Sequence, residues 1–255
     1  MGVKTCAWGP HAWVVIHGLS DAADHHLQTC GDKHKRAFRH SVVNLFNMLW
    51  KVLPCIHCRN SLEQFMRDPA TSLSRIRGDG HPEAPVSFME WSYRIHRRVN
   101  QKLFWQQVRQ AGDNVDSLLA KWWNYEPGGA ASVRCIRPDD GVWWFHLFTF
   151  VYYIVCDFEA GGRGQAIAAF LPQVGNLLET MHYGEGVRLT HAVTHIRVPA
   201  DFADTLAARI TYVTNIQRAT GNVDNTAVCD PAEMTSICSE SIVGCSADDK
   251  NQVGC

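Results

Sequence analysis

The chain has 255 residues, a hydrophobic fraction of 46% and a formal net charge of −1. This composition excludes a disordered protein and allows one large core or two smaller ones. The balanced charge gives no argument for binding to nucleic acid, and no apolar stretch is long enough to predict a membrane span.

Apolar residues recur at helical spacing along most of the chain, and few segments alternate as strands do. The predicted helices cover residues 10–28, 36–52, 55–68, 86–106, 114–124, 142–158, 163–182 and 200–219. Glycine and proline interrupt the pattern between residues 127 and 140. The sequence therefore predicts an all-α protein with a first helical domain over 1–126, a second over 127–220 and a cysteine-bearing tail over 221–255.

The first predicted helix carries an aromatic pair. Trp13 and His17 are four residues apart, so they share one helix face and can stack together on a flat ligand. Taken alone, the pair fits a core aromatic beside a satisfied histidine more simply.

Two cysteines follow Pro54 at the predicted start of a helix. Cys55 and Cys58 have the Cys-x-x-Cys spacing, and a helix N-terminus favours a thiolate. On spacing alone, redox chemistry and zinc binding are equally supported.

The predicted helix over 86–106 combines a ring, hydrogen-bonding groups and a cation on adjoining faces. Its candidate binding residues are Trp91, His96, Asn100 and Lys102. This mixture suits a ligand with aromatic rings and a pyrophosphate, although one such helix alone would not be specific.

Together and in this order, the three motifs closely resemble the Erv/ALR family of FAD-linked sulfhydryl oxidases, especially its compact viral members. In that family a Trp-x-x-x-His helix precedes Pro-Cys-x-x-Cys, and a helix of the form Trp-x-x-x-x-His-Asn-x-Val-Asn-x-Lys/Arg-Leu follows. The resemblance covers residues 6–106 and does not extend to 127–255. Arg97 stands where the family has asparagine, and Trp105 stands where it has a later phosphate-side lysine.

The resemblance implies a four-helix bundle, with a short fifth helix, that binds FAD. The residues expected to contact the flavin and adenine are Trp13, His17, Trp91 and His96. Asn100 and Lys102 are expected to hold the ribose and phosphates. Cys58 would lie against the isoalloxazine, and Cys55 would face incoming thiols.

The activity implied by the resemblance is thiol oxidation. Protein dithiols and O2 would be the substrates, disulfides and H2O2 the products, and the protein would form a homodimer or an intrachain pseudo-dimer. Its viral members suggest a viral factory, the host cytoplasm or the virion; the mitochondrial intermembrane space or another organelle is the alternative. The competing hypotheses are a non-catalytic virion or scaffold protein and a zinc-binding module that uses Cys55, Cys58 and His57.

A weak internal repeat links the two halves. Residues 53–58 resemble residues 171–176, and residues 94–100 resemble residues 209–215. Chance similarity between amphipathic helices explains this equally well. A real repeat would make the second half a degenerate copy of the first, without cysteines at the corresponding positions.

The chain has ten cysteines, four of them in the last 27 residues. Family members often use a second cysteine pair as an electron shuttle. The candidates for that role are Cys6, Cys30, Cys238, Cys245 and Cys255, and structural disulfides are the alternative.

Overall fold

The computed structural model describes residues 5–78, 80–111, 135–156, 162–202 and 204–221. These residues form helices and contain no strand, which confirms the predicted all-α class. The α-helices are α1 (Thr5–Thr29), α2 (Asp32–Val52), α3 (Ile56–Arg67), α4 (Ser74–Arg77), α5 (Phe88–Ala111), α7 (Gly141–Cys156), α8 (Gly162–Thr180), α9 (Gly184–His195) and α10 (Leu206–Ala219), with a short 3-10 helix η1 (Pro69–Thr71). The predicted helix over 114–124 lies outside the described residues.

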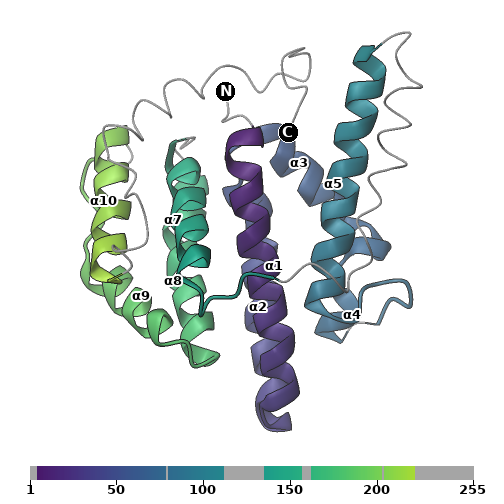
Figure 1. The fold of residues 1–255 in the computed structure, drawn as a ribbon, viewed down its shortest axis with the longest axis horizontal. Helices are drawn as coiled ribbons and strands as arrows, with labels where there is room; N and C mark the ends of the chain where they lie inside the picture. Colours follow the sequence, from purple (N-terminus) through teal and green to yellow (C-terminus); the bar gives the residue numbers. More distant parts are fainter. Residues whose placement is uncertain (1–4, 79, 112–134, 157–161, 203, 222–255) are drawn as a thin grey trace.

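The long helices form two layers (Figure 1). One layer has the order α10, α7, α1 and α5, because α1 packs against both α5 and α7, and α7 also packs against α10. The other layer has the order α9, α8, α2 and α3. Contacts of α3 with α5 and of α9 with α10 join the layers at their two ends.

The second half repeats the neighbour relations of the first. α7 has α10 on its outer side as α1 has α5, and α8 has α9 as α2 has α3. The halves meet where α1 packs on α7 and α2 packs on α8. Their buried side chains belong to one hydrophobic core, which runs from Trp8 and Phe46 to Phe150 and Ile216.

The internal repeat is wrong in its first part. Pro54 lies between α2 and α3, whereas Pro172 lies inside α8, so residues 53–58 and 171–176 occupy different places. The other part places Arg94 on α5 and Arg209 on α10, which are corresponding helices. The similarity of the halves therefore lies in helix packing more than in aligned motifs.

Helix α9 was not predicted from the sequence. Its two glycines and its β-branched residues have low helix propensity. Its buried side is formed by the small or compact residues Gly186, Leu189 and Ala192, spaced three apart. A Cβ on Gly186 would lie 2.5 Å from the backbone nitrogen of Glu179, so glycine permits the close approach of α9 to α8. Tertiary packing, not intrinsic propensity, maintains this helix.

The contact between the halves requires a glycine on α1. A Cβ on Gly18 would lie 2.3 Å from the carbonyl oxygen of Ile136 and 2.6 Å from the indole of Trp143. Trp143 is fully buried, so its ring has no free space into which to move. An ion pair between Arg137 and Asp21 holds the same segment on α1.

We predict that Gly18→Ala lowers the free energy of unfolding by about 1–3 kcal/mol, because the added methyl overpacks the junction. Gly9→Ala is the matched control on the same helix, since its Cβ would meet only a methyl of Thr5 at 3.5 Å. Alanine there should be neutral or slightly stabilising. Urea unfolding of both variants provides the test, and equal stability of the two would contradict the predicted steric role of Gly18.

Candidate functional site

The junction between α2 and α3 presents the two cysteines. Cys55 caps α3 in an extended conformation, and the backbone N–H of Cys58 donates to its Sγ at 3.3 Å. Arg59, which is buried, donates to the carbonyl oxygen of Leu53 at 2.9 Å and so satisfies the end of α2. Both cysteines are present as thiols. The turn is thus fixed by hydrogen bonds at the end of one helix and the start of the next.

The exposures of the two cysteines differ from the expectation. Cys55, expected to face incoming thiols, is only 2% exposed. Cys58, expected to face inward, is half-buried and lines a cavity. The capping position explains the burial of Cys55, because its side chain turns back over the first turn of α3. A thiol from solution would reach Cys55 only after neighbouring groups move.

Cys58 lies among groups with opposing effects on its thiol. A hydrogen bond with Cys55 and burial raise the pKa of Cys58 above its ordinary value. Thr5 Oγ1, 3.4 Å from the sulfur, and the positive charge of Lys102 lower this pKa in part. The helix N-terminus was expected to favour a thiolate, but the sulfur that caps the helix is that of Cys55. In the dithiol form Cys58 therefore keeps its proton.

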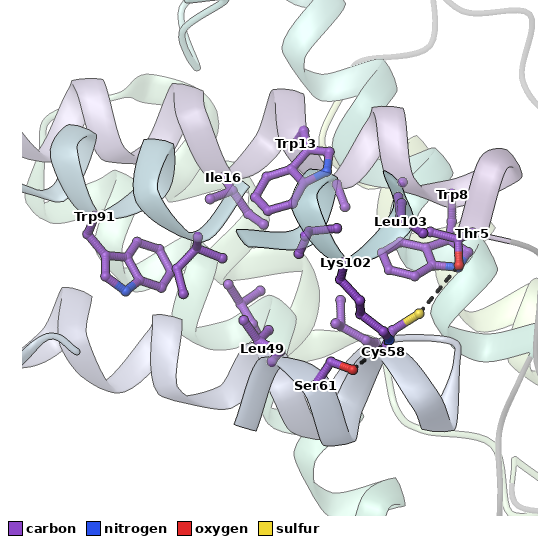
Figure 2. Close-up of a pocket in the computed structure, with 16 residues that line it drawn as sticks. Thr5, Trp8, Trp13, Ile16, Leu49, Cys58, Ser61, Trp91, Lys102 and Leu103 are labelled. Atoms are coloured by element: carbon purple, nitrogen blue, oxygen red, sulfur yellow. Dashed lines mark hydrogen bonds between the residues drawn. The ribbon is translucent and has the colours of Figure 1, made fainter. Parts of the chain in front are cut away.

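The cavity beside Cys58 has a volume of about 70 Å³ and almost entirely apolar walls. Figure 2 shows Trp91 at one end, Trp13 along one side and Cys58 at the other end. Lys102 reaches the cysteine end, where its Nζ donates to Ser61 Oγ at 2.6 Å. An aromatic, apolar space thus ends at a thiol and an ammonium group.

A stacked cluster lies beside this cavity. The rings of Trp13 and His96 are nearly parallel, with centroids 3.9 Å apart, and His17 lies 5.7 Å from Trp13. His17 Nε2 is 3.0 Å from His96 Nδ1, and His17 Nδ1 is 2.9 Å from Ser92 Oγ. Burial lowers the pKa of both histidines to about 4, so both are neutral at pH 7.

The structure brings most of the predicted site residues together. The predicted residues that line the cavity are Trp13, Trp91, Lys102 and Cys58. His17 and His96 contact Trp13 but are not part of the cavity wall. Asn100 is half-buried on α5 and is not part of that wall either. Trp91 also has a structural role, because its fully buried indole donates to the carbonyl oxygen of Thr71 at 3.1 Å.

Four polar or aromatic residues of the site were not among the predicted site residues: Thr5, Trp8, Ser61 and Ser92. Ser61 follows Cys58 by three residues and therefore shares its helix face, a spacing that could have identified it. Ser92 adjoins Trp91, but only the neighbouring helix shows that its hydroxyl meets His17.

The chemistry of the site fits a flavin, but its present volume does not. Broad apolar walls suit an isoalloxazine ring, and the Cys58 sulfur and the Lys102 ammonium suit an electron donor and an anionic group. A cavity of about 150 Å³ is needed to hold benzene alone, so three fused rings require more than the space seen here. Binding would therefore require side chains such as the stacked Trp13 to move.

A buried tyrosine joins α7 to α10 in the second half. Tyr152 is 1% exposed, and its hydroxyl makes hydrogen bonds with Thr214 Oγ1 at 2.7 Å and Gln217 Oε1 at 3.2 Å. Hydrogen bonds of Tyr152 thus link α7 to α10, as the contact of His17 with His96 links α1 to α5.

Among the shuttle candidates, Cys30 lies far from Cys58. Cys30 is a thiol immediately after the C-terminal end of α1, whereas Thr5, which contacts Cys58, begins that helix. A 25-residue helix is roughly 37 Å long, which excludes direct exchange between Cys30 and Cys58 of one chain. The side chains of the other candidates lie outside the described residues. Cys156, at the end of α7, is disulfide-bonded.

Within the described part of the chain, no group of three or more His, Cys, Asp or Glu side chains is placed to hold a metal ion. No helix among those residues is both long enough and apolar enough to cross a membrane. Comparisons of the chain with protein-family models, curated proteins and solved structures found no match.

We predict that acid weakens the fold through its buried histidines. The lowered pKa values of His11, His17 and His96, each about 4, mean that the unfolded chain binds more protons between pH 6.5 and 4. Stability is therefore lost as the pH falls through this window, by about 1–2 kcal/mol per histidine between pH 7 and pH 5. Urea unfolding at the two pH values measures the loss.

His96→Gln should reduce this pH dependence, whereas His34→Gln, at an exposed position, should leave it unchanged. If the fold were equally stable at pH 5 and pH 7, or if both variants behaved alike, the buried histidines would not be its cause.

Proposed function

We propose that the protein is an FAD-dependent thiol oxidase that forms disulfide bonds in other proteins. The observation that carries this proposal is the Cys58 sulfur in the wall of an aromatic, apolar cavity, next to Cys55 and within reach of the Lys102 charge. The proposal also uses the resemblance of the three sequence motifs to the Erv/ALR family.

The reaction begins with the Cys55–Cys58 pair oxidised. A substrate thiolate attacks the Cys55 sulfur, the bond between the two cysteines breaks, and Cys58 leaves as the thiolate. The second substrate thiol, after losing its proton, attacks the mixed disulfide, which releases the substrate disulfide and the Cys55 thiolate. The two substrate electrons are then held by the reduced cysteine pair. Bound FAD supplies the two-electron acceptor that passes them to O2, with H2O2 as the product.

The residues around the two cysteines have different roles in this reaction. Thr5 and Lys102 stabilise negative charge on Cys58 when it leaves as a thiolate. Cys55 Sγ accepts a hydrogen bond from the backbone N–H of Cys58 at the start of α3, where the helix dipole favours negative charge. The burial of Cys55 restricts attack to thiols whose binding opens the junction.

We infer that the second half serves as a built-in partner for the first. α7 and α8 pack on the faces of α1 and α2 that point away from α5 and α3, and they repeat that arrangement without a Cys-x-x-Cys junction. An intrachain pseudo-dimer with one active half accounts for this arrangement. We therefore expect one flavin per chain. A viral factory or virion location remains a prediction from the resemblance.

The alternatives make different predictions. A scaffold protein would be colourless and inactive, and a zinc-binding module would retain zinc through dialysis at a stoichiometric amount. The described residues give Cys55 and Cys58 no group of further ligands, which weakens the zinc alternative. Flavin absorbance of the purified protein, with metal analysis of the same sample, separates the three hypotheses.

We predict that Cys58→Ser retains bound flavin but loses O2 uptake with dithiothreitol by at least about 100-fold, because no disulfide can form. Cys30→Ser is the control, since Cys30 lies at the far end of α1 and should keep full activity. Flavin absorbance and an oxygen electrode measure the two properties. Full turnover by Cys58→Ser would remove Cys58 from the mechanism.

We predict that Lys102→Met moves the rising limb of the pH profile to higher pH. Lys102 lowers the pKa of Cys58, so its removal raises that pKa further, and thiolate formation requires a more alkaline solution. A shift of about 0.5–1 pH unit is expected for a partly screened charge. Turnover against pH at saturating FAD measures it. Lys33→Met, at an exposed position of α2, should not shift the profile; equal profiles for both variants would contradict the role of Lys102.

A further inference from the structure

Ser92 begins a chain of hydrogen bonds that crosses from α5 to α1 and returns. Its Oγ donates to the carbonyl oxygen of Met89 at 2.9 Å, within α5. The same Oγ lies 2.9 Å from His17 Nδ1 on α1. The opposite nitrogen of that ring, Nε2, is 3.0 Å from His96 Nδ1, back on α5. Ser92 is fully buried, so water does not compete for its hydroxyl.

The proton positions follow from the number of protons available. A hydroxyl has one proton, and two oxygens 2.9 Å apart would repel each other unless that proton lies between them. The Ser92 proton therefore points to Met89, and His17 must supply the proton of the second contact from Nδ1. A neutral His17 then has a lone pair on Nε2, so the proton between the two rings belongs to His96 Nδ1.

The protonation of His96, the last residue in this series of hydrogen bonds, follows from these assignments. His96 is neutral at pH 7, because burial and the neighbouring His17 lower its pKa to about 4. With its proton on Nδ1, its Nε2 carries a lone pair. That nitrogen has no hydrogen-bond partner among the described residues. The His96 ring lies behind the cavity wall, stacked on Trp13, which does line the cavity, so a movement of Trp13 would bring His96 next to a bound ligand.

We propose that Ser92 is a positioning residue that fixes the tautomers of His17 and His96 and makes His96 Nε2 a hydrogen-bond acceptor for the ligand. The ligand group that it selects is a donor on a heteroaromatic ring, such as an exocyclic amine or an imide N–H. The ligand part of this inference rests on the proposed function, whereas the tautomer part does not.

Removal of the Ser92 oxygen should reverse the donor and acceptor roles of His17 and His96. In Ser92→Ala, a proton on His17 Nδ1 would have no acceptor in a buried place, which is costly. Moving it to Nε2 lets His17 donate to His96 Nδ1, and His96 then carries its proton on Nε2. His96 Nε2 then donates instead of accepting, so a hydrogen-bond donor on the ligand would face another donor.

The tautomers can be measured directly by long-range ¹H–¹⁵N NMR on protein labelled at histidine. The signals of His17 and His96 are assigned by substitution of each residue. We expect both rings protonated on Nδ1 in the unsubstituted protein and both on Nε2 in Ser92→Ala. FAD affinity should fall about 10-fold in the variant. Ser41→Ala, which removes a similar hydroxyl-to-carbonyl bond on an exposed face of α2, should change neither property.

Protonation of either ring on Nε2 in the unsubstituted protein would overturn the inference without any variant. Unchanged tautomers in Ser92→Ala would overturn the role of Ser92, and reversed tautomers with unchanged FAD affinity would overturn the ligand part. A protein that binds no FAD would refute the proposed function, while the NMR result would still decide the tautomer part.

Discussion

The position of α1 between α5 and α7 is the constraint on which the rest of the structure depends. Toward α5 the helix presents Trp13 and His17, which build the site. Toward α7 it presents His11 and Gly18, which build the junction of the halves. Each pair lies on one side of the helix, since four and seven residues return close to the same direction. Any rotation of α1 would therefore disturb the site and the junction together.

Both contacts of α1 contain a pair of neutral histidines. His11 and His146 approach within 2.8 Å between their Nδ1 atoms across α1 and α7, and His17 and His96 within 3.0 Å across α1 and α5. Burial lowers the pKa of all four rings, so each ring is neutral with one N–H, and one N–H of each pair lies in the contact between the two rings. Buried polar pairs contribute less to stability than to specificity, because a shifted helix leaves them unsatisfied. These pairs fix the register of α1 against its two neighbours.

The sequence predicted the features that local spacing determines. The helical class and most helix positions follow from periodicity. The grouping of Trp13 and Trp91 around Cys58 was implied by the resemblance of the three motifs to a known family. Helix α9 could not be predicted, because its stability comes from close packing of Gly186 on α8. The burial of Cys55 could not be predicted from the sequence either, because it depends on how this residue caps α3. Ser92 gave no signal, as its partner is 75 residues away.

The two halves show how similar helix packing can place different residues at the ends and faces of the helices. In the first half, α2 ends at a turn that presents two thiols, and the cavity beyond it is bordered by Trp13, which is stacked on His96. In the second half, the residues between α8 and α9 include no cysteine, and Tyr152 joins α7 to α10 through satisfied hydrogen bonds. A ligand at this position would have to break those bonds, and they hold α7 against α10. α7 in turn packs on α1, which carries Trp13 and His17 on its other side. The second half thus packs on the side of α1 opposite to the helix that contacts Trp13 and His17.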